Sequence, residues 1–316
     1  MTARPESVIA VFGDLLATLG IDVDVARATA ELAQLLKDPW AGYCHNPLQH
    51  RSALTESGAP FELSLKIEVD GGLSLRYVVD VADPALDLVG NIERYLDAAR
   101  LITGQTDEVL RRLFNCHLGG ALAGTRATVM HGVGWLSAGR RRGTLYFPAG
   151  WLAPDALAQR LPGPLELPGR AQVVGYDFDA DGLASWKTYH WLRPDPARPL
   201  SERFDLGRLP SAACVIHDRF AADVPEGARE KSTFLQLRRE VDAVHARLFF
   251  FALPWGWGST RSMVGLLALL RSFGLDLRPL RAVADCMRRH GLSAHVGLVS
   301  VGGYDITSVT FYFWPI

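Results

Sequence analysis

The segment Phe61–Asp80, FELSLKIEVDGGLSLRYVVD, decides the fold because it has the pattern of a β-hairpin. Apolar and polar residues alternate on both sides of Asp70-Gly71-Gly72, whose glycines suit the positive backbone angles of a tight turn. Alternate side chains of a strand point to opposite faces, so one face of this hairpin is apolar. The other face carries Glu62 and Arg76, and it is either a solvated surface or the wall of a site.

With 316 residues the chain can bury a sizeable core, as one large domain or two ordinary ones, and the repeat described below leads us to expect a single domain over residues 1–316. The formal net charge is -1 and no basic face is concentrated, so we expect no nucleic-acid partner. No apolar run approaches the roughly 18 residues of a membrane span, so we expect no membrane partner either. The four cysteines lie far apart without a CxxC pair, which is typical of reduced thiols in a cytoplasmic protein.

A repeated two-stranded unit organises the whole chain. Five such units alternate with helical segments, and the second strand of each contains a comparable short core: Arg76-Tyr77-Val78, Thr144-Leu145-Tyr146, Lys187-Thr188-Tyr189, Arg247-Leu248-Phe249 and Thr310-Phe311-Tyr312. The expected strand pairs are 61–69 with 73–80, 127–136 with 142–150, 171–178 with 183–192, 213–220 with 245–255, and 294–301 with 305–315. The expected helices are 5–19, 23–37, 85–102, 106–115, 153–160, 259–272 and 277–290.

Ten antiparallel strands with intervening helices allow two architectures. One is an open sheet with helices on one face and water on the other, and the second is a closed barrel with helices outside and a polar lumen. Closure removes unpaired strand edges and explains why the polar residues share one face. We therefore predict an α+β fold, a ten-stranded antiparallel β-barrel with a wet lumen, built from five ββ units and surrounded by α-helices. A barrel of this width leaves a chamber that its side chains do not fill.

Five short motifs give the sequence a family resemblance over nearly its whole length: PFELS at 60–64, LRY at 75–77, LYF at 145–147, WKTY at 186–189 and FYF at 311–313. In this order and spacing the sequence resembles the aromatic prenyltransferases of the ABBA-barrel superfamily, near the indole (dimethylallyltryptophan synthase) and cyanobactin peptide branches. The resemblance implies an allylic diphosphate in the lumen, cations that bind the diphosphate, tyrosines that shield the allyl cation and a glutamate that holds the acceptor. It also implies that no cofactor is required, or that Mg²⁺ assists diphosphate binding.

The resemblance also assigns roles to single residues. Glu62 takes the catalytic, acceptor-binding position, and Arg76 takes the first diphosphate-binding position. Lys187 and Tyr189 match the Lys-x-Tyr motif of the third unit, at the diphosphate. The residues expected to shield the cation are Tyr146, Tyr189, Tyr312 and the lumen-facing Trp191.

The sequence departs from the indole-enzyme pattern at several of these positions. Thr144 replaces the lysine of the second unit, although Arg142 lies on the same face two residues earlier. Ser185 replaces an arginine of the third unit. The fourth unit has Arg247 and Phe249 where a glutamine and a tyrosine are usual. Arg142 and Arg247 are therefore expected to complete the positive charge at the diphosphate.

These observations predict an enzyme that transfers a dimethylallyl or geranyl group from its diphosphate to an electron-rich aromatic acceptor. The acceptor is an indole or tryptophan, a tyrosine or a small aromatic, either free or within a peptide. The alternative is a non-catalytic α+β ligand-binding or interaction protein with a solvated β-face. No aspartate-rich DDxxD run is present, and no metal site is expected. The segment Asp177–Gly182 begins like a calcium loop, but Thr188 stands at its twelfth position, so we interpret this segment as a turn.

Overall fold

The computed structural model describes residues 4–45, 52, 54–55, 58–83, 85–118, 128–136, 139–149, 171–191, 233–239, 244–251, 260–292, 294–302 and 306–315. Its helices are α1 (Pro5–Thr18), α2 (Val25–His45), α3 (Leu88–Thr103), α4 (Asp107–Leu118), α9 (Thr260–Ser272) and α10 (Arg278–Arg289). Its strands are β1 (Phe61–Glu68), β2 (Leu73–Asp80), β3 (Met130–Leu136), β4 (Arg141–Pro148), β5 (Ala171–Asp179), β6 (Gly182–Trp191), β7 (Thr233–Arg239), β8 (Val244–Phe251), β9 (Ala294–Gly302) and β10 (Ser308–Pro315).

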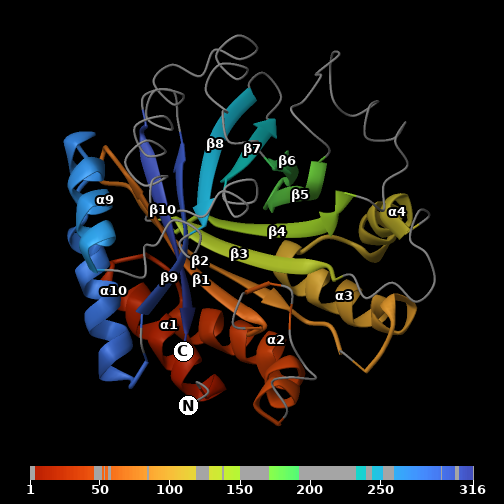
Figure 1. Cartoon of the computed structure of the whole chain (residues 1–316). Helices are drawn as coiled ribbons and strands as arrows, with labels where there is room; N and C mark the ends of the chain where they lie inside the picture. The colour runs from red at the N-terminus through yellow and green to blue at the C-terminus, as the bar shows by residue number, and fades with distance from the viewer. Residues whose placement is uncertain are drawn as a thin grey trace.

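The ten strands form one closed antiparallel barrel, in the order β1-β10-β9-β8-β7-β6-β5-β4-β3-β2 (Figure 1). Neighbours in the sequence are neighbours in the sheet, and β1 closes the ring by pairing with β10, so that Leu65 lies opposite Phe311. On its other side β1 pairs with β2, and Ser64 lies opposite Arg76. Closure confirms the predicted barrel. The open-sheet alternative, with its polar face turned to bulk water, is wrong.

Helices lie around the barrel (Figure 1), and the apolar residues of the strands pack with them in one buried core. Phe12 of α1 contacts the rings of Tyr77 and Trp135, at centroid distances of 5.3 and 5.2 Å. Trp40 of α2 packs against Phe61, 6.2 Å away between centroids. These side chains are fully buried, and burial of aromatic surface is the largest favourable contribution to such a fold. The polar faces are therefore left to line the lumen.

Two assignments differ markedly from the predicted ones. The helix predicted to end at residue 37 continues through Pro39 to His45, because Trp40 on this last part is buried against the barrel. The partner of β8 is β7, Thr233–Arg239, so the prediction of 213–220 as the first strand of the fourth unit is wrong. Residues 213–220 and the helix predicted at 153–160 lie outside the described residues. Among the described helices, none has the length and apolar character that crossing a membrane requires.

Candidate active site

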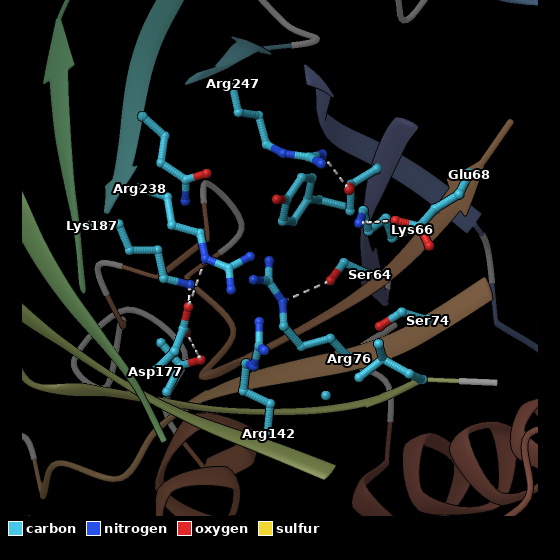
Figure 2. A pocket seen from close by; sticks show the side chains of 16 residues that line it. Ser64, Lys66, Glu68, Ser74, Arg76, Arg142, Asp177, Lys187, Arg238 and Arg247 are labelled. Carbon is cyan, nitrogen blue, oxygen red and sulfur yellow. Dashed lines mark hydrogen bonds and ion pairs between the residues drawn. The ribbon is translucent and has the colours of Figure 1, made fainter. Parts of the chain in front are cut away.

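A polar cavity of about 150 Å³ occupies the lumen, and cationic side chains from most of the strands line it (Figure 2). Six cations contribute to the wall: Lys66, Arg76, Arg142, Lys187, Arg238 and Arg247. Arg76 and Arg142 come from β2 and β4, and Figure 2 shows both side chains pointing into the cavity from the same side. Such convergence of positive charge in an enclosed space favours an anionic ligand.

Arg76 connects the cationic wall to an aromatic part of the lumen. Its Nε donates to Ser64 Oγ at 3.1 Å, and its Nη1 donates to Tyr146 Oη at 3.1 Å. Its Cζ lies 5.3 Å from the ring centroid of Tyr312, a cation–π distance. All these contacts are with neutral groups, so they orient the guanidinium without cancelling its charge.

Arg247 is held in the same way. Its guanidinium donates to the hydroxyl groups of Ser300 at 3.0 Å, Thr310 at 2.8 Å and Ser308 at 2.6 Å. Burial lowers the pKa of Arg247, and the guanidinium still stays charged at neutral pH because its ordinary pKa is so high. Gly302 lies opposite Arg247 across the β8–β9 pair, and the arginine side chain fills the space that a Cβ there would take.

Lys187 and Arg238 have a different environment, because both face the buried carboxylate of Asp177 (Figure 2). Lys187 Nζ lies 2.7 Å from Asp177 Oδ1, and Arg238 Nε lies 3.7 Å from Oδ2. Thr144 and Ser185 donate to the two carboxylate oxygens at 2.7 and 2.8 Å. Burial opposes ionisation of Asp177, but Lys187 and the hydrogen bonds outweigh it and lower its pKa to about 2.

Three tyrosines lie beside the cations. The rings of Tyr146 and Tyr189 meet edge to face, 6.1 Å apart between centroids, and Lys187 Nζ lies 5.3 Å from the Tyr146 ring. Gln236 Nε2 donates to Tyr189 Oη at 2.6 Å. Burial raises the pKa of Tyr189 well above its ordinary value, so the phenol stays neutral. Together with Tyr312, these rings offer electron-rich faces next to the anion site.

Glu62 lies on the lumen side of β1, one alternate position beyond Ser64, and its side chain is only 8% exposed. At the opposite end of the same strand face, Lys66 forms an ion pair with Glu68. Burial, together with the nearby charge of Arg247, lowers the pKa of Lys66. The polar face of this hairpin therefore extends from a buried carboxylate to a partly exposed ion pair.

The structure brings most of the predicted site residues together. Arg76, Arg142, Lys187, Arg247 and Tyr312 line the cavity. Tyr146 contacts Arg76 and Lys187, and Tyr189 packs against Tyr146. Trp191 ends β6, and its side chain lies outside the described part of the structure.

Several residues of the site were not predicted, among them Asp177, Gln236 and Arg238. Asp177 lies within the predicted strand 171–178, so the interpretation of the whole segment Asp177–Gly182 as a turn is wrong at its start: β5 continues to Asp179, and the side chain of Asp177 points into the lumen. Gln236 and Arg238 were missed with β7. The alternation of Phe234, Gln236 and Arg238 with Leu235 and Leu237 is the signal that locates this strand.

The carboxylates of the described cavity wall do not fit a Mg²⁺ ion. They are Glu68 and Asp177, and each already faces a lysine at ion-pair distance. The oxygens of Asp177 also accept from Thr144 and Ser185. Mg²⁺ requires near-ideal octahedral coordination by oxygens, and these oxygens are already used by cations and hydroxyl groups.

Comparisons with known proteins support the fold. No protein-family model matches the sequence, and no curated protein matches it significantly. The solved structures do match. A 6-dimethylallyltryptophan synthase from Micromonospora olivasterospora, in complex with DMASPP and Trp, superposes with a TM-score of 0.74 at 17% identity, covering 99% of this chain and 97% of that one.

Two further structures agree. A 5-dimethylallyltryptophan synthase from Streptomyces coelicolor, also with DMASPP and Trp, has a TM-score of 0.72 at 18% identity, over 98% of this chain and 94% of that one. AnaPT from Neosartorya fischeri has a TM-score of 0.64 at 13% identity, over 100% and 95%. This chain has the aromatic prenyltransferase barrel fold. At such identities the likeness extends to the fold, and the chemistry has to be inferred from the lumen itself.

Proposed function

We propose that this protein is an aromatic prenyltransferase that transfers a dimethylallyl or geranyl group from its diphosphate to an electron-rich aromatic acceptor. The observation that carries the proposal is the contact of Arg76 with Tyr146 and Tyr312 in the arginine-lined lumen of a closed barrel. Two structures with the same fold contain DMASPP and Trp, which supports a dimethylallyl donor and an indole acceptor. A tyrosine, a small aromatic or a peptide-borne aromatic remains within the proposal.

The reaction begins with cleavage of the bond between the allylic carbon and the diphosphate oxygen, whose electron pair leaves with the diphosphate. Arg76, Arg142 and Arg247 stabilise the developing negative charge, with Lys187 beside them. These groups are fixed before the reaction, since Arg76 and Arg247 are each hydrogen-bonded to side-chain hydroxyls. Little reorganisation is then required when the charge separates.

The allyl cation forms next to Tyr146, Tyr189 and Tyr312. Their faces stabilise a delocalised cation, and the enclosing barrel limits its capture by water. Because Arg76 contacts both Tyr146 and Tyr312, the leaving group and the cation occupy adjacent parts of the lumen. A ring carbon of the acceptor then attacks the cation, and a carbon–carbon bond forms.

Transfer of a proton from the attacked carbon to the released diphosphate, the base beside the cation, restores the aromatic ring. We assign Glu62 to the acceptor, as the buried carboxylate on the lumen side of β1, where it binds an N–H or O–H group and draws electron density into the ring. The donor set of the cavity does not fit Mg²⁺, so we propose that the cations of the chain alone bind the diphosphate.

The test is incubation with dimethylallyl or geranyl diphosphate against a panel of indoles, phenols and peptides that contain Trp or Tyr, with products read by mass. Addition of one prenyl unit is expected, and Arg76→Met should abolish it. Arg111→Met, which changes an arginine on the outer surface of α4, is the matched control and should keep the activity. The proposal fails if no acceptor is modified and calorimetry detects no binding of inorganic diphosphate.

A further inference from the structure

The cations of the lumen fall into two groups according to their partners. Six cationic and two acidic side chains line the cavity, a formal excess of four positive charges. Lys66 faces Glu68, while Lys187 and Arg238 share Asp177. Within the described residues, the remaining three cations, Arg76, Arg142 and Arg247, form no ion pair with a carboxylate.

The contacts of Asp177 fix its carboxylate in the wall of the cavity. Its side chain is 1% exposed, both of its oxygens accept hydrogen bonds from hydroxyl groups, and Lys187 approaches to 2.7 Å. Removal of this carboxylate from its partners would leave a buried ammonium without a counter-charge, which is strongly unfavourable. The neutralisation of Lys187 is therefore a fixed property of this wall.

A negative charge in an anion site weakens the binding of the anion. A diphosphate ester carries about three negative charges near neutral pH, which match the three guanidinium groups without a carboxylate partner. One more uncompensated positive charge would strengthen the binding of the diphosphate product as much as that of the donor, and uniform strengthening slows release without accelerating bond cleavage.

We propose that Asp177 limits the affinity of the lumen for diphosphate by offsetting one of the two positive charges of Lys187 and Arg238, so that Arg76, Arg142 and Arg247 form the direct anion site. Asp177 is then a positioning and charge-balancing residue that contacts neither the prenyl group nor the acceptor. This inference rests on the proposed function, because it concerns the diphosphate site of that reaction. It goes beyond that function in assigning a residue that opposes ligand binding.

The experiment measures the affinity for inorganic diphosphate by calorimetry at fixed ionic strength, without donor or acceptor. Asp177→Asn keeps the shape and removes the charge, and it should tighten binding about tenfold, because one opposing charge is lost close to the anion. The double variant Asp177→Asn, Lys187→Met removes one charge of each sign and should return the affinity to within about threefold of the unmodified protein. Thermal unfolding of each variant confirms that the protein measured is folded.

Two outcomes would overturn the inference. Weaker binding by Asp177→Asn would show that Asp177 serves to present Lys187 directly to the diphosphate. Unchanged binding would show that its charge does not reach the anion site. Either result leaves the proposed function intact as long as the unmodified protein binds diphosphate, whereas absence of binding by the unmodified protein would count against the proposed function itself.

Discussion

Gly302→Ala is the smallest change that tests whether Arg247 is positioned for diphosphate. A Cβ on residue 302 would lie 2.9 Å from Nε of Arg247 and 3.1 Å from Cζ, well inside van der Waals contact. Residue 302 is not among the described glycines with positive φ, so alanine adds no backbone strain there. The side chain of Arg247 must therefore move.

The cost of that movement follows from the contacts that hold the guanidinium. Arg247 donates to Ser300, Thr310 and Ser308 at 2.6–3.0 Å, and a hydrogen bond from a charged group contributes about 1.5–3 kcal/mol. A shift that breaks one of these bonds should raise the Kd for a diphosphate by about 10- to 100-fold. Calorimetry with inorganic diphosphate or an unreactive thiodiphosphate measures this directly.

Gly134→Ala is the matched control, because Gly134 lines the same cavity. Its added Cβ would lie 3.6 Å from the nearest atom of Arg76, an ordinary contact, and we expect the Kd to change by less than about threefold. In an Arg247→Ala background, Gly302→Ala should raise the Kd for diphosphate little further, since the side chain that it displaces is gone. If Gly302→Ala lowered the affinity for diphosphate equally with and without the side chain of Arg247, this explanation would be refuted.

Three other predictions test separate parts of the site and fold. Glu62→Ala should lower turnover at least about tenfold while the Kd for the thiodiphosphate stays within about threefold, because the carboxylate serves the acceptor; unchanged turnover would remove that assignment. Prenyl transfer should persist in excess EDTA, since the carboxylates of the described cavity wall already pair with lysines, and full loss restored by Mg²⁺ would contradict this. Burial lowers the pKa of His131 to about 4, so the unfolded chain takes up its proton first as the pH falls. The stability of the protein should then decline by up to about 3 kcal/mol from pH ~6.5 to ~4 in urea unfolding, and His131→Gln should flatten this dependence.

The sequence predicted the barrel because its evidence is repeated along the chain. Alternation in Phe61–Asp80 gives the two faces of one hairpin, and recurrence of the unit gives the number of strands. The inference failed for the fourth unit, where β7 spans only Thr233–Arg239 between charged residues. The more apolar segment at 213–220 has the composition of a strand, and local composition does not reveal which of two segments reaches β8.

Sequence analysis could predict a site residue where the residue type and its local motif indicate a role, as with Arg76 or the Lys187–Tyr189 pair. Asp177 is a site residue that sequence analysis could not identify. Its importance depends on Lys187 from β6 and Thr144 from β4, which reach it only after the strands pair in register. In the sequence the same residue stands near the end of a predicted strand, two positions before the turn that begins at Asp179, and nothing in the local pattern indicates that it faces a lysine.

The polar interior of this barrel depends on its apolar exterior. Ser64, Arg76 and Thr310 can point inward because their neighbours Leu65, Tyr77 and Phe311 are fully buried under the helices, which fixes the pleat of each strand. A register slip of one residue would put the cations against helices and the leucines into the lumen, so the hydrophobic core holds the site to a single arrangement. Precise placement of charges at the diphosphate is therefore a consequence of core packing, and core substitutions near Tyr77 should affect diphosphate affinity as well as stability.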